Sequence, residues 1–190
     1  MVMALRPNRG GFSKPFGAGW FIREYLLGNG PEGSTPIDPE RGAPQADINY
    51  EYKETLARAT ARERAEKIIS RMVVSGADVT EEQAEKIHER ELKKVSRNFT
   101  RMRYQSFLVY FGVIRRLNWV QLTSESERSS IQDNYPDAPD RAYYRLTQAG
   151  REAGDDLWSN PQYALYPENG RSHQSKKTGW PHRKVRTPQR

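Results

Sequence analysis

The side chains best suited to chemistry in this chain lie at the start of a predicted helix, residues 101–117. Between Phe99 and Val120 the sequence has four arginines and no acidic residue. Arginine can fork onto guanine and glutamine onto adenine, and the first residues of a helix in the major groove usually reach the base edges. The pattern predicts DNA recognition by a set of polar residues there, namely Thr100, Arg101, Arg103, Gln105 and Ser106.

Two further arginines stand near the far end of the same helix. At that position Arg115 and Arg116 are better placed for phosphate than for bases. The other interpretation of the whole stretch is the solvated polar face of a helix that packs on a core, and the residues alone leave both open.

A second basic region lies at 171–190. It carries seven positive charges and no acidic side chain, whereas residues 1–170 carry 24 basic and 24 acidic side chains. Counterion release makes such a segment a salt-sensitive anchor on phosphate, and Trp180 can stack on an exposed base. An acidic protein or an anionic membrane surface is an alternative partner, and a solvated end is the plainest interpretation. The predicted contacts are Lys176, Lys177, Trp180, Arg183, Lys184 and Arg186.

Residues that could perform catalysis are scarce. The chain has no cysteine, which excludes a thiol nucleophile, disulfides and cysteine-bound zinc. His88 and Glu89 begin a zincin-like pattern, but Leu92 stands where the second ligand belongs. Asp155 and Asp156 are adjacent, so on a helix they point about 100° apart, as surface charges do. We expect no enzyme, no catalytic residues, no metal site and no cofactor.

Helical patterns dominate the first half of the chain. Residues 16–27 have the apolar spacing of a short amphipathic helix. Four prolines in 31–46 exclude a helix through most of that stretch, which is a linker or an ordered loop. The longest helical pattern covers 47–74. Thr80 and Gln83 form a possible capping box that opens the next helix.

Two short strands follow the helix at 101–117. Asn118 is placed for the left-handed turn that ends that helix. A strand is predicted at 119–123 and another around Tyr143, with a polar loop at 124–140 between them. Thr147 is a good N-cap for a last helix that reaches about Ser159.

The segment from Phe107 to Glu152, with FLVYFGVIRRLNWVQLTSES and RAYYRLTQAGRE, resembles the wing half of winged helix-turn-helix transcription regulators such as the PadR-like and MarR-like families. With the preceding helix the resemblance covers about two fifths of the chain. It implies that 80–95 is the first helix of the helix-turn-helix, 101–117 the recognition helix and 124–140 the wing. It also implies binding to double-stranded DNA.

The wing departs from the pattern expected of a DNA-binding loop. Residues 124–140 contain five acidic side chains and, among basic ones, Arg128 alone. Basic residues suit a loop that approaches the minor groove, and an acidic loop repels phosphate. The wing is therefore either turned away from the duplex, a docking surface for a basic partner, or a solvated loop.

We predict a mostly α-helical protein with a small β-hairpin wing. Its parts are an N-terminal extension at 1–46 with one short helix, a winged-helix domain at 47–159 and a basic, disordered tail at 160–190. The expected function is non-catalytic DNA binding in transcriptional or replication control. The alternative is a structural or assembly subunit that docks proteins through the winged helix and anchors RNA or DNA through the tail. A homodimer through the helix at 47–74 also stays open.

Hydropathy sets the expected location. No apolar run approaches the 18 or so residues that a membrane span needs. The apolar stretch at the start of the sequence is too short for a signal peptide. We expect a soluble intracellular protein without a membrane partner, either cytoplasmic or associated with the nucleoid.

Overall fold

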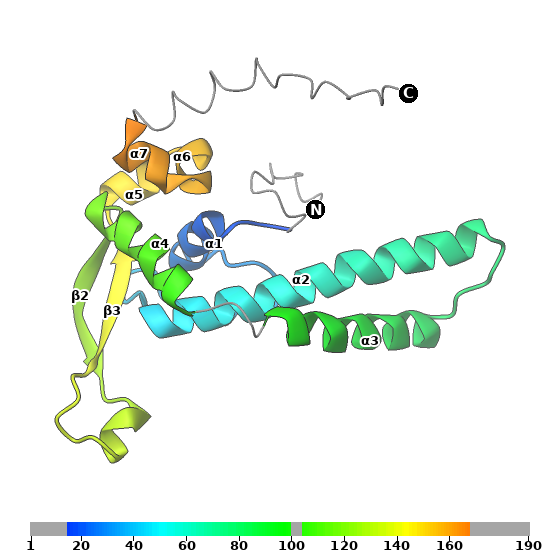
Figure 1. The fold of residues 1–190 in the computed structure, drawn as a ribbon, viewed down its shortest axis with the longest axis horizontal. Helices are drawn as coiled ribbons and strands as arrows, with labels where there is room; N and C mark the ends of the chain where they lie inside the picture. Colours follow the sequence, from blue (N-terminus) through cyan, green and yellow to red (C-terminus); the bar gives the residue numbers. More distant parts are fainter. Residues whose placement is uncertain (1–14, 100–103, 168–190) are drawn as a thin grey trace, which may run out of the picture.

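The computed structural model describes residues 15–99 and 104–167, and of residues 96–99 only the backbone. The protein is mostly helical, with a small three-stranded antiparallel sheet and a two-helix arm that extends to one side (Figure 1). The described elements are α1 (Ala18–Leu26), β1 (Ala43–Pro44), α2 (Gln45–Val74), α3 (Glu81–Phe99), α4 (Tyr104–Arg116), β2 (Val120–Glu127), the 3-10 helix η1 (Ser130–Asp133), β3 (Arg141–Leu146), α5 (Gln148–Glu152), α6 (Asp155–Ser159) and α7 (Pro161–Leu165).

One aromatic core holds together residues 15–56 and 104–167, which we call the body. Its cluster joins side chains from α1, α2, α4, β2, β3 and α6. The Phe111 ring meets Tyr144 edge-on at 5.1 Å, and Trp119 lies 4.7 Å from Trp158 between ring centroids. The largest fully buried members are Phe21, Ile22, Leu26, Ile48, Leu56, Phe111, Ile114 and Trp158. Helix α1 therefore shares its core with the sheet and with α4.

The sheet has the strand order β1-β3-β2, and both pairings are antiparallel. Strand β1 is two residues long and lies at an edge, where Pro44 is tolerated. Gly42, just before it, has a φ of +77°, and a Cβ there would lie 2.1 Å from the carbonyl oxygen of Tyr144. A glycine is thus required where the chain passes β3 to enter α2.

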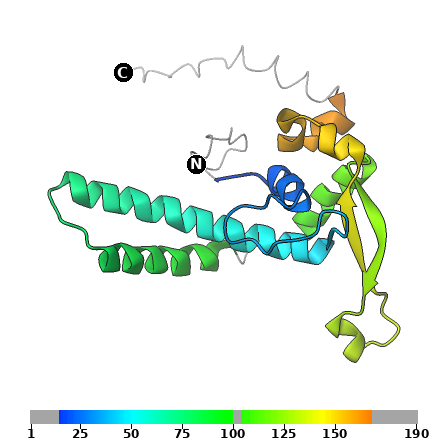
Figure 2. The same cartoon turned by 180° about the vertical axis from the view of Figure 1, so that it is seen from behind.

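The arm consists of residues 57–95, from the outer part of α2 to most of α3. The two helices run side by side in both views (Figures 1 and 2). A small cluster separate from the body core joins them, formed by Ala57, Ala61 and Val95 with Leu92 packed against it. At the tip, Val74 is 85 % exposed. The arm thus has a narrow seam of small apolar side chains and a charged surface.

The segment between α1 and β1 is an ordered loop that crosses the first half of α2, as Figure 2 shows from behind. The Thr35 hydroxyl donates a 2.6 Å hydrogen bond to Glu51, and the Arg62 guanidinium lies 2.7 Å from the Glu32 carboxylate. Of the two interpretations of residues 31–46, the ordered loop is the one observed.

Several local predictions are confirmed. The capping box forms, since the backbone N–H of Gln83 donates to the Thr80 hydroxyl and that of Thr80 donates to the Gln83 side chain. Asn118 has a φ of 55° and ends α4. The Thr147 hydroxyl accepts from the backbone N–H of Gly150 at 3.1 Å. Each motif is closed by hydrogen bonds within a few residues, which is why the sequence reveals it.

The loop at 124–140 is more regular than predicted. Strand β2 continues to Glu127 after a register shift, and η1 follows it. The Gln132 amide organises the turn, because it donates to the carbonyl oxygen of Ala138 at 2.7 Å and to the Asp140 carboxylate at 2.9 Å. These bonds join residues six and eight positions apart, so a local sequence pattern does not predict them.

The predicted last helix, from Thr147 to about Ser159, is in fact two helices. Ala153 has a φ of −60° and a ψ of 130°, which separates α5 from α6. This bend lets the Trp158 indole N–H donate to the carbonyl oxygen of Gly150 at 3.0 Å inside the core. A third helix, α7, then begins at the fully buried Pro161, inside the segment predicted to be a disordered tail.

The helix predicted at 80–95 is observed as α3. It packs along α2, and their shared seam defines the arm. The resemblance implies that this element also packs on the helix after it, but among the described residues α3 packs chiefly on α2, and α3 with α4 is not one of the main packing pairs. The linking residues 100–103 lie outside the described chain.

Candidate nucleic-acid interface

Helix α4 is held in place by its apolar side and by the turn at its end. Phe107 and Phe111 are buried in the body core. After the helix, the backbone N–H of Trp119 donates to the carbonyl oxygen of Ile114 at 3.1 Å across the Asn118 turn. The opposite side of α4 is consequently presented outward from a rigid support.

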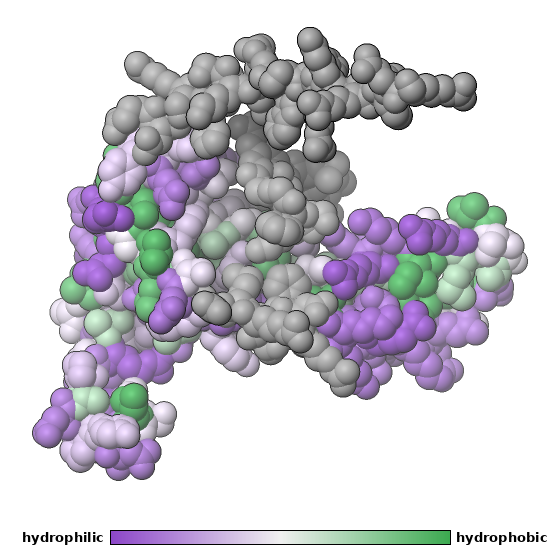
Figure 3. All heavy atoms as spheres, viewed as in Figure 1, coloured by the Kyte–Doolittle hydropathy of each residue, from purple (hydrophilic) through white to green (hydrophobic). Residues whose placement is uncertain are grey.

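The exposed side of α4 is polar at its start, apolar in the middle and basic at its end. We call it the α4 face. Leu108 is 37 % and Val109 is 64 % exposed, and hydrophobic side chains lie along this helix in Figure 3. Helix α4 has no acidic residue. The polar and basic members of the face are Gln105, Ser106, Arg115 and Arg116.

Both arginines of the α4 face also contact aromatic side chains of the body. The Arg115 guanidinium carbon lies 5.5 Å from the centroid of the Tyr144 ring, within cation–π range. Arg116 donates a long hydrogen bond of 3.4 Å to the Tyr166 hydroxyl. The two side chains remain exposed, so each is oriented by a neighbour and still open to an anion.

The structure brings four of the predicted DNA-binding residues onto one helix. Gln105 and Ser106 lie in the first turn of α4, and Arg115 and Arg116 lie in the last. The other three, Thr100, Arg101 and Arg103, fall outside the described residues. The predicted contacts of the tail also fall outside them; these are Lys176, Lys177, Trp180, Arg183, Lys184 and Arg186.

The β2–β3 hairpin beside α4 has an ion-paired acidic side chain, Glu127, where its strands end and the loop begins. Glu127 is contacted by the Tyr143 hydroxyl at 2.5 Å and by Arg141 at 3.0 Å. The Arg41 guanidinium stacks over Tyr143 at 4.8 Å. Partial burial, and next the hydrogen bond to Glu127, raise the pKa of Tyr143 above its usual value. This network fixes the hairpin to the start of α2, because Arg141 also pairs with Asp47.

The tip of the hairpin is acidic and exposed. Asp133 and Asp137 are both exposed there, as are Ile131 and Tyr135. The tip lies at the far end of the sheet from α7 in both ribbon views (Figures 1 and 2). The α4 face and the acidic tip are therefore separate surfaces of opposite charge character.

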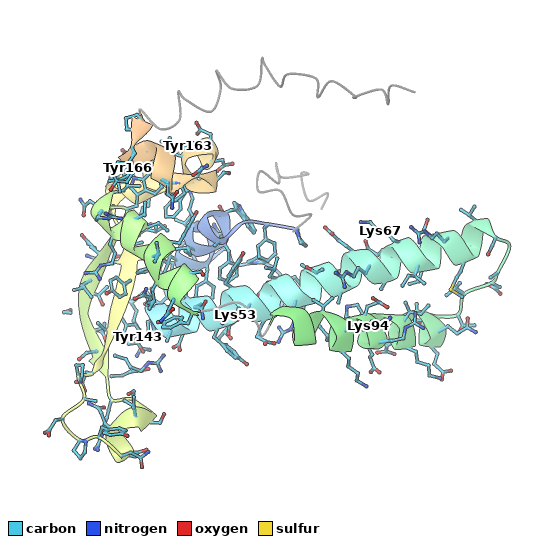
Figure 4. All side chains as sticks on the ribbon, in the orientation of Figure 1. Lys53, Lys67, Lys94, Tyr143, Tyr163 and Tyr166 are labelled. Carbon is cyan, nitrogen blue, oxygen red and sulfur yellow. The ribbon has the colours of Figure 1, made fainter. Side chains whose placement is uncertain are left out.

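Two exposed tyrosines that no sequence pattern singled out lie on α7 and at its end, where α7 packs against α4, and one of them, Tyr166, contacts Arg116. Tyr163 and Tyr166 belong to α7 and its end, and they are 41 % and 42 % exposed (Figure 4). Because α7 falls in a stretch rich in proline and small polar residues, its residues were counted with the tail. Pro161 at the first helical position was the available signal for this helix.

Asp155 and His88, which were considered above for catalysis, both lie among the described residues. Asp155 pairs with Arg23, which ties α6 to α1. His88 lies half-buried on α3 in the arm. Within residues 15–99 and 104–167, His, Cys, Asp and Glu side chains do not gather in a group of three that could hold a metal ion. None of the helices in these ranges combines the length and apolar character needed to cross a bilayer.

Comparison with known proteins gives no match: no family model fits the chain, and no curated protein or solved structure is significantly similar to it.

Proposed function

We propose that the protein binds double-stranded DNA through the α4 face, as a non-catalytic regulator of transcription or replication. The observation that carries the proposal is a helix with no acidic residue whose outward side holds amide, hydroxyl and guanidinium groups. A helix of this kind fits the major groove of B-DNA, where such groups read base edges and neutralise phosphate.

The architecture around α4 supports a winged-helix interpretation of the body. Helix α4 leads directly into a β-hairpin, and the short strand β1 before α2 completes the sheet beside β3. In winged-helix proteins the helix before the hairpin is the recognition helix. Helix α3, the first helix of the helix-turn-helix in this interpretation, then belongs to the arm and packs along α2.

Each part of the α4 face has a suitable DNA partner. Gln105 in the first turn can fork onto adenine, and Arg115 and Arg116 in the last turn suit backbone phosphates. Leu108 and Val109 between them offer apolar contact to the methyl group of thymine. The acidic tip of the hairpin has to lie away from the duplex, since Asp133 and Asp137 repel phosphate.

The test measures the affinity of the full chain for duplex DNA by fluorescence anisotropy at a series of salt concentrations. Arg115→Gln keeps a polar side chain at this position but removes the charge and with it the cation–π contact to Tyr144. It is expected to weaken binding to mixed-sequence duplex and to reduce the slope of log K against log salt by about 1. Lys67→Gln is the matched control, because Lys67 is an exposed cation on the arm (Figure 4). An unchanged slope for Arg115→Gln, or an equal change for both variants, contradicts the proposal.

A second function, protein docking within a larger assembly, is favoured by one observation. The middle of the α4 face is apolar, and Leu122 on the adjoining strand β2 is 53 % exposed. Val109→Ala separates the two functions, because it removes apolar area from a docking surface but leaves the charges that give duplex binding its salt dependence unchanged. If the full chain shows no duplex binding even at low salt, docking becomes the better explanation.

A further inference from the structure

The corner where α7 meets the end of α4 exposes two aromatic rings beside an arginine. Tyr163 and Tyr166 are three residues apart, and more than a third of each side chain is open to solvent. Arg116 reaches Tyr166 from α4 through the 3.4 Å hydrogen bond to its hydroxyl. Figure 4 shows both tyrosines at this end of the body, away from the arm. We call this group the tyrosine corner.

The support beneath the tyrosine corner is rigid. Pro161 is fully buried at the start of α7, and Trp158 three residues earlier fills the core. The Tyr110 hydroxyl of α4 donates to the carbonyl oxygen of Trp158 at 3.1 Å, which links α4 to α6, and α7 packs against both of these helices. The backbone of α7 is therefore anchored while its tyrosine rings project, so holding a planar ligand does not require ordering the backbone first.

The charge around the corner favours an anionic ligand. Neither α4 nor the stretch 161–167 contains an acidic residue. Glu168 follows this stretch, and residues 171–190 then carry seven positive charges and no acidic side chain. Another exposed tyrosine, Tyr135, is 67 % exposed but stands among the acids of the hairpin tip. Exposed aromatic rings thus occur in two opposite electrostatic settings on the same molecule.

From this geometry we infer that the tyrosine corner binds single-stranded nucleic acid, with unpaired bases stacked on Tyr163 and Tyr166 and a backbone phosphate held by Arg116. Stacking on aromatic side chains is tolerant of base identity, and cationic groups along the strand supply the salt-dependent part of the affinity. Duplex DNA keeps its bases stacked inside, so it cannot use the two rings. The site shares Arg116 with the α4 face, but stacking on the two rings plays no part in duplex reading.

The experiment measures anisotropy of labelled oligo-dT and oligo-U with the full chain, so that the basic segment is the same in every sample. The Tyr163→Ala/Tyr166→Ala double variant is expected to bind at least about tenfold more weakly to the preferred strand. Tyr163→Phe/Tyr166→Phe keeps the rings and is expected to stay within about twofold of the parent, since stacking needs the ring alone. The oligonucleotide that binds more tightly shows whether the site prefers a DNA or an RNA strand.

Tyr135→Ala is the matched control, because it removes an even more exposed ring from the acidic tip. Its affinity for the oligonucleotides should equal that of the parent. The inference is overturned if the double alanine variant binds as the parent does, or if Tyr135→Ala weakens binding as much. Loss of affinity in the phenylalanine variant equal to that in the alanine variant also overturns it, since the hydroxyls would then be responsible.

A second measurement uses the unmodified protein, in case the alanine variants fold poorly. Photocrosslinking to bromouracil-substituted strands followed by peptide mapping should label residues 161–167. Crosslinks confined to other segments contradict the tyrosine corner. Failure of duplex binding in the Arg115→Gln series leaves this result untouched, because Arg115 is not part of the tyrosine corner and duplex DNA does not use the two rings.

Discussion

The two halves of helix α2 face different surroundings, although they are one continuous helix. The first half, 45–56, is covered by α1, the sheet and the loop before it, and its side chains Ile48, Tyr52 and Leu56 are almost fully buried. The outer part belongs to the arm; its alanines meet Val95 of α3, and the loop before β1 reaches only its start, through Arg62 and Glu32. The body therefore has large apolar areas to bury, whereas the arm has a narrow seam.

This difference in buried apolar area predicts which part of the protein contributes most to its stability. Free energy from apolar burial scales with the area removed from water, so the aromatic body should dominate the global unfolding transition. The arm should open more readily, since its charged outer surface and small interior contacts contribute little. The α4 face and the tyrosine corner, the two surfaces proposed for binding, both lie on the body, which is the more rigid part.

The largest expected effect comes from Trp158→Ala in the body. It removes a fully buried ring, its contact with Trp119 and the hydrogen bond to Gly150. We expect the free energy of unfolding to fall by about 3–5 kcal/mol, measured by guanidinium denaturation with circular dichroism. Val74→Ala at the arm tip should change it by less than about 0.5 kcal/mol. Similar losses for the two variants contradict the comparison.

Alkaline pH should weaken the body next. Burial raises the pKa of Tyr52 from 10.0 to about 12 in the folded protein. The neutral phenol is thus favoured by folding, so this contribution is complete below pH 10, declines as pH rises and is lost near pH 12. Denaturation at stepped pH should show a loss on the order of 2–3 kcal/mol from this group.

The control for this pH dependence is Tyr52→Phe, which keeps the ring but cannot ionise and should flatten the decline between pH 10 and 12. Burial, and next the nearby Glu51 and Asp47, raise the pKa of Tyr25 to about 12 as well. Tyr25 will therefore leave part of the pH dependence of the unfolding free energy in place. The arm, residues 57–95, contains no tyrosine. A decline identical in the parent and in Tyr52→Phe contradicts the assignment.

A smaller effect is expected from Val95→Ala in the arm. This side chain is fully buried against Ala57 and Ala61. Removing two methyl groups should cost about 1.5 kcal/mol, concentrated in local opening of the arm. Hydrogen exchange should become faster in α3 and the outer part of α2 while the core strands keep their protection. Equal acceleration throughout the body would show that the arm and body unfold together.

The smallest effect is expected from Lys86→Ala, which removes the i,i+4 ion pair with Glu82 on the arm surface. An exposed pair of this kind contributes about 0.3–0.5 kcal/mol, reduced further by salt. Thermal unfolding at low and high salt checks the result. A loss above about 1 kcal/mol would mean that surface charge, and not the apolar seam, holds the arm together.

Local sequence signals were enough to find most of the helices and their ends. The helices α1 and α2 follow from apolar spacing, and the caps at Thr80, Asn118 and Thr147 follow from residue type. The same logic placed Gln105, Ser106, Arg115 and Arg116 on one helix. The tyrosine corner was missed, because Tyr163 and Tyr166 acquire their setting from a helix that the prolines and polar residues around it conceal.

The sequence by itself determined the helical spacing, the capping residues, the basic character of α4 and the acidic character of the hairpin. These are properties of neighbouring residues, and hydrogen bonds across three or four positions express them directly. Only the tertiary structure decided that α3 lies along α2, that the last predicted helix bends so that Trp158 enters the core, and that α7 rests against α4. Those outcomes depend on which apolar surfaces bury one another across long sequence separations, and burial is set by the whole chain at once.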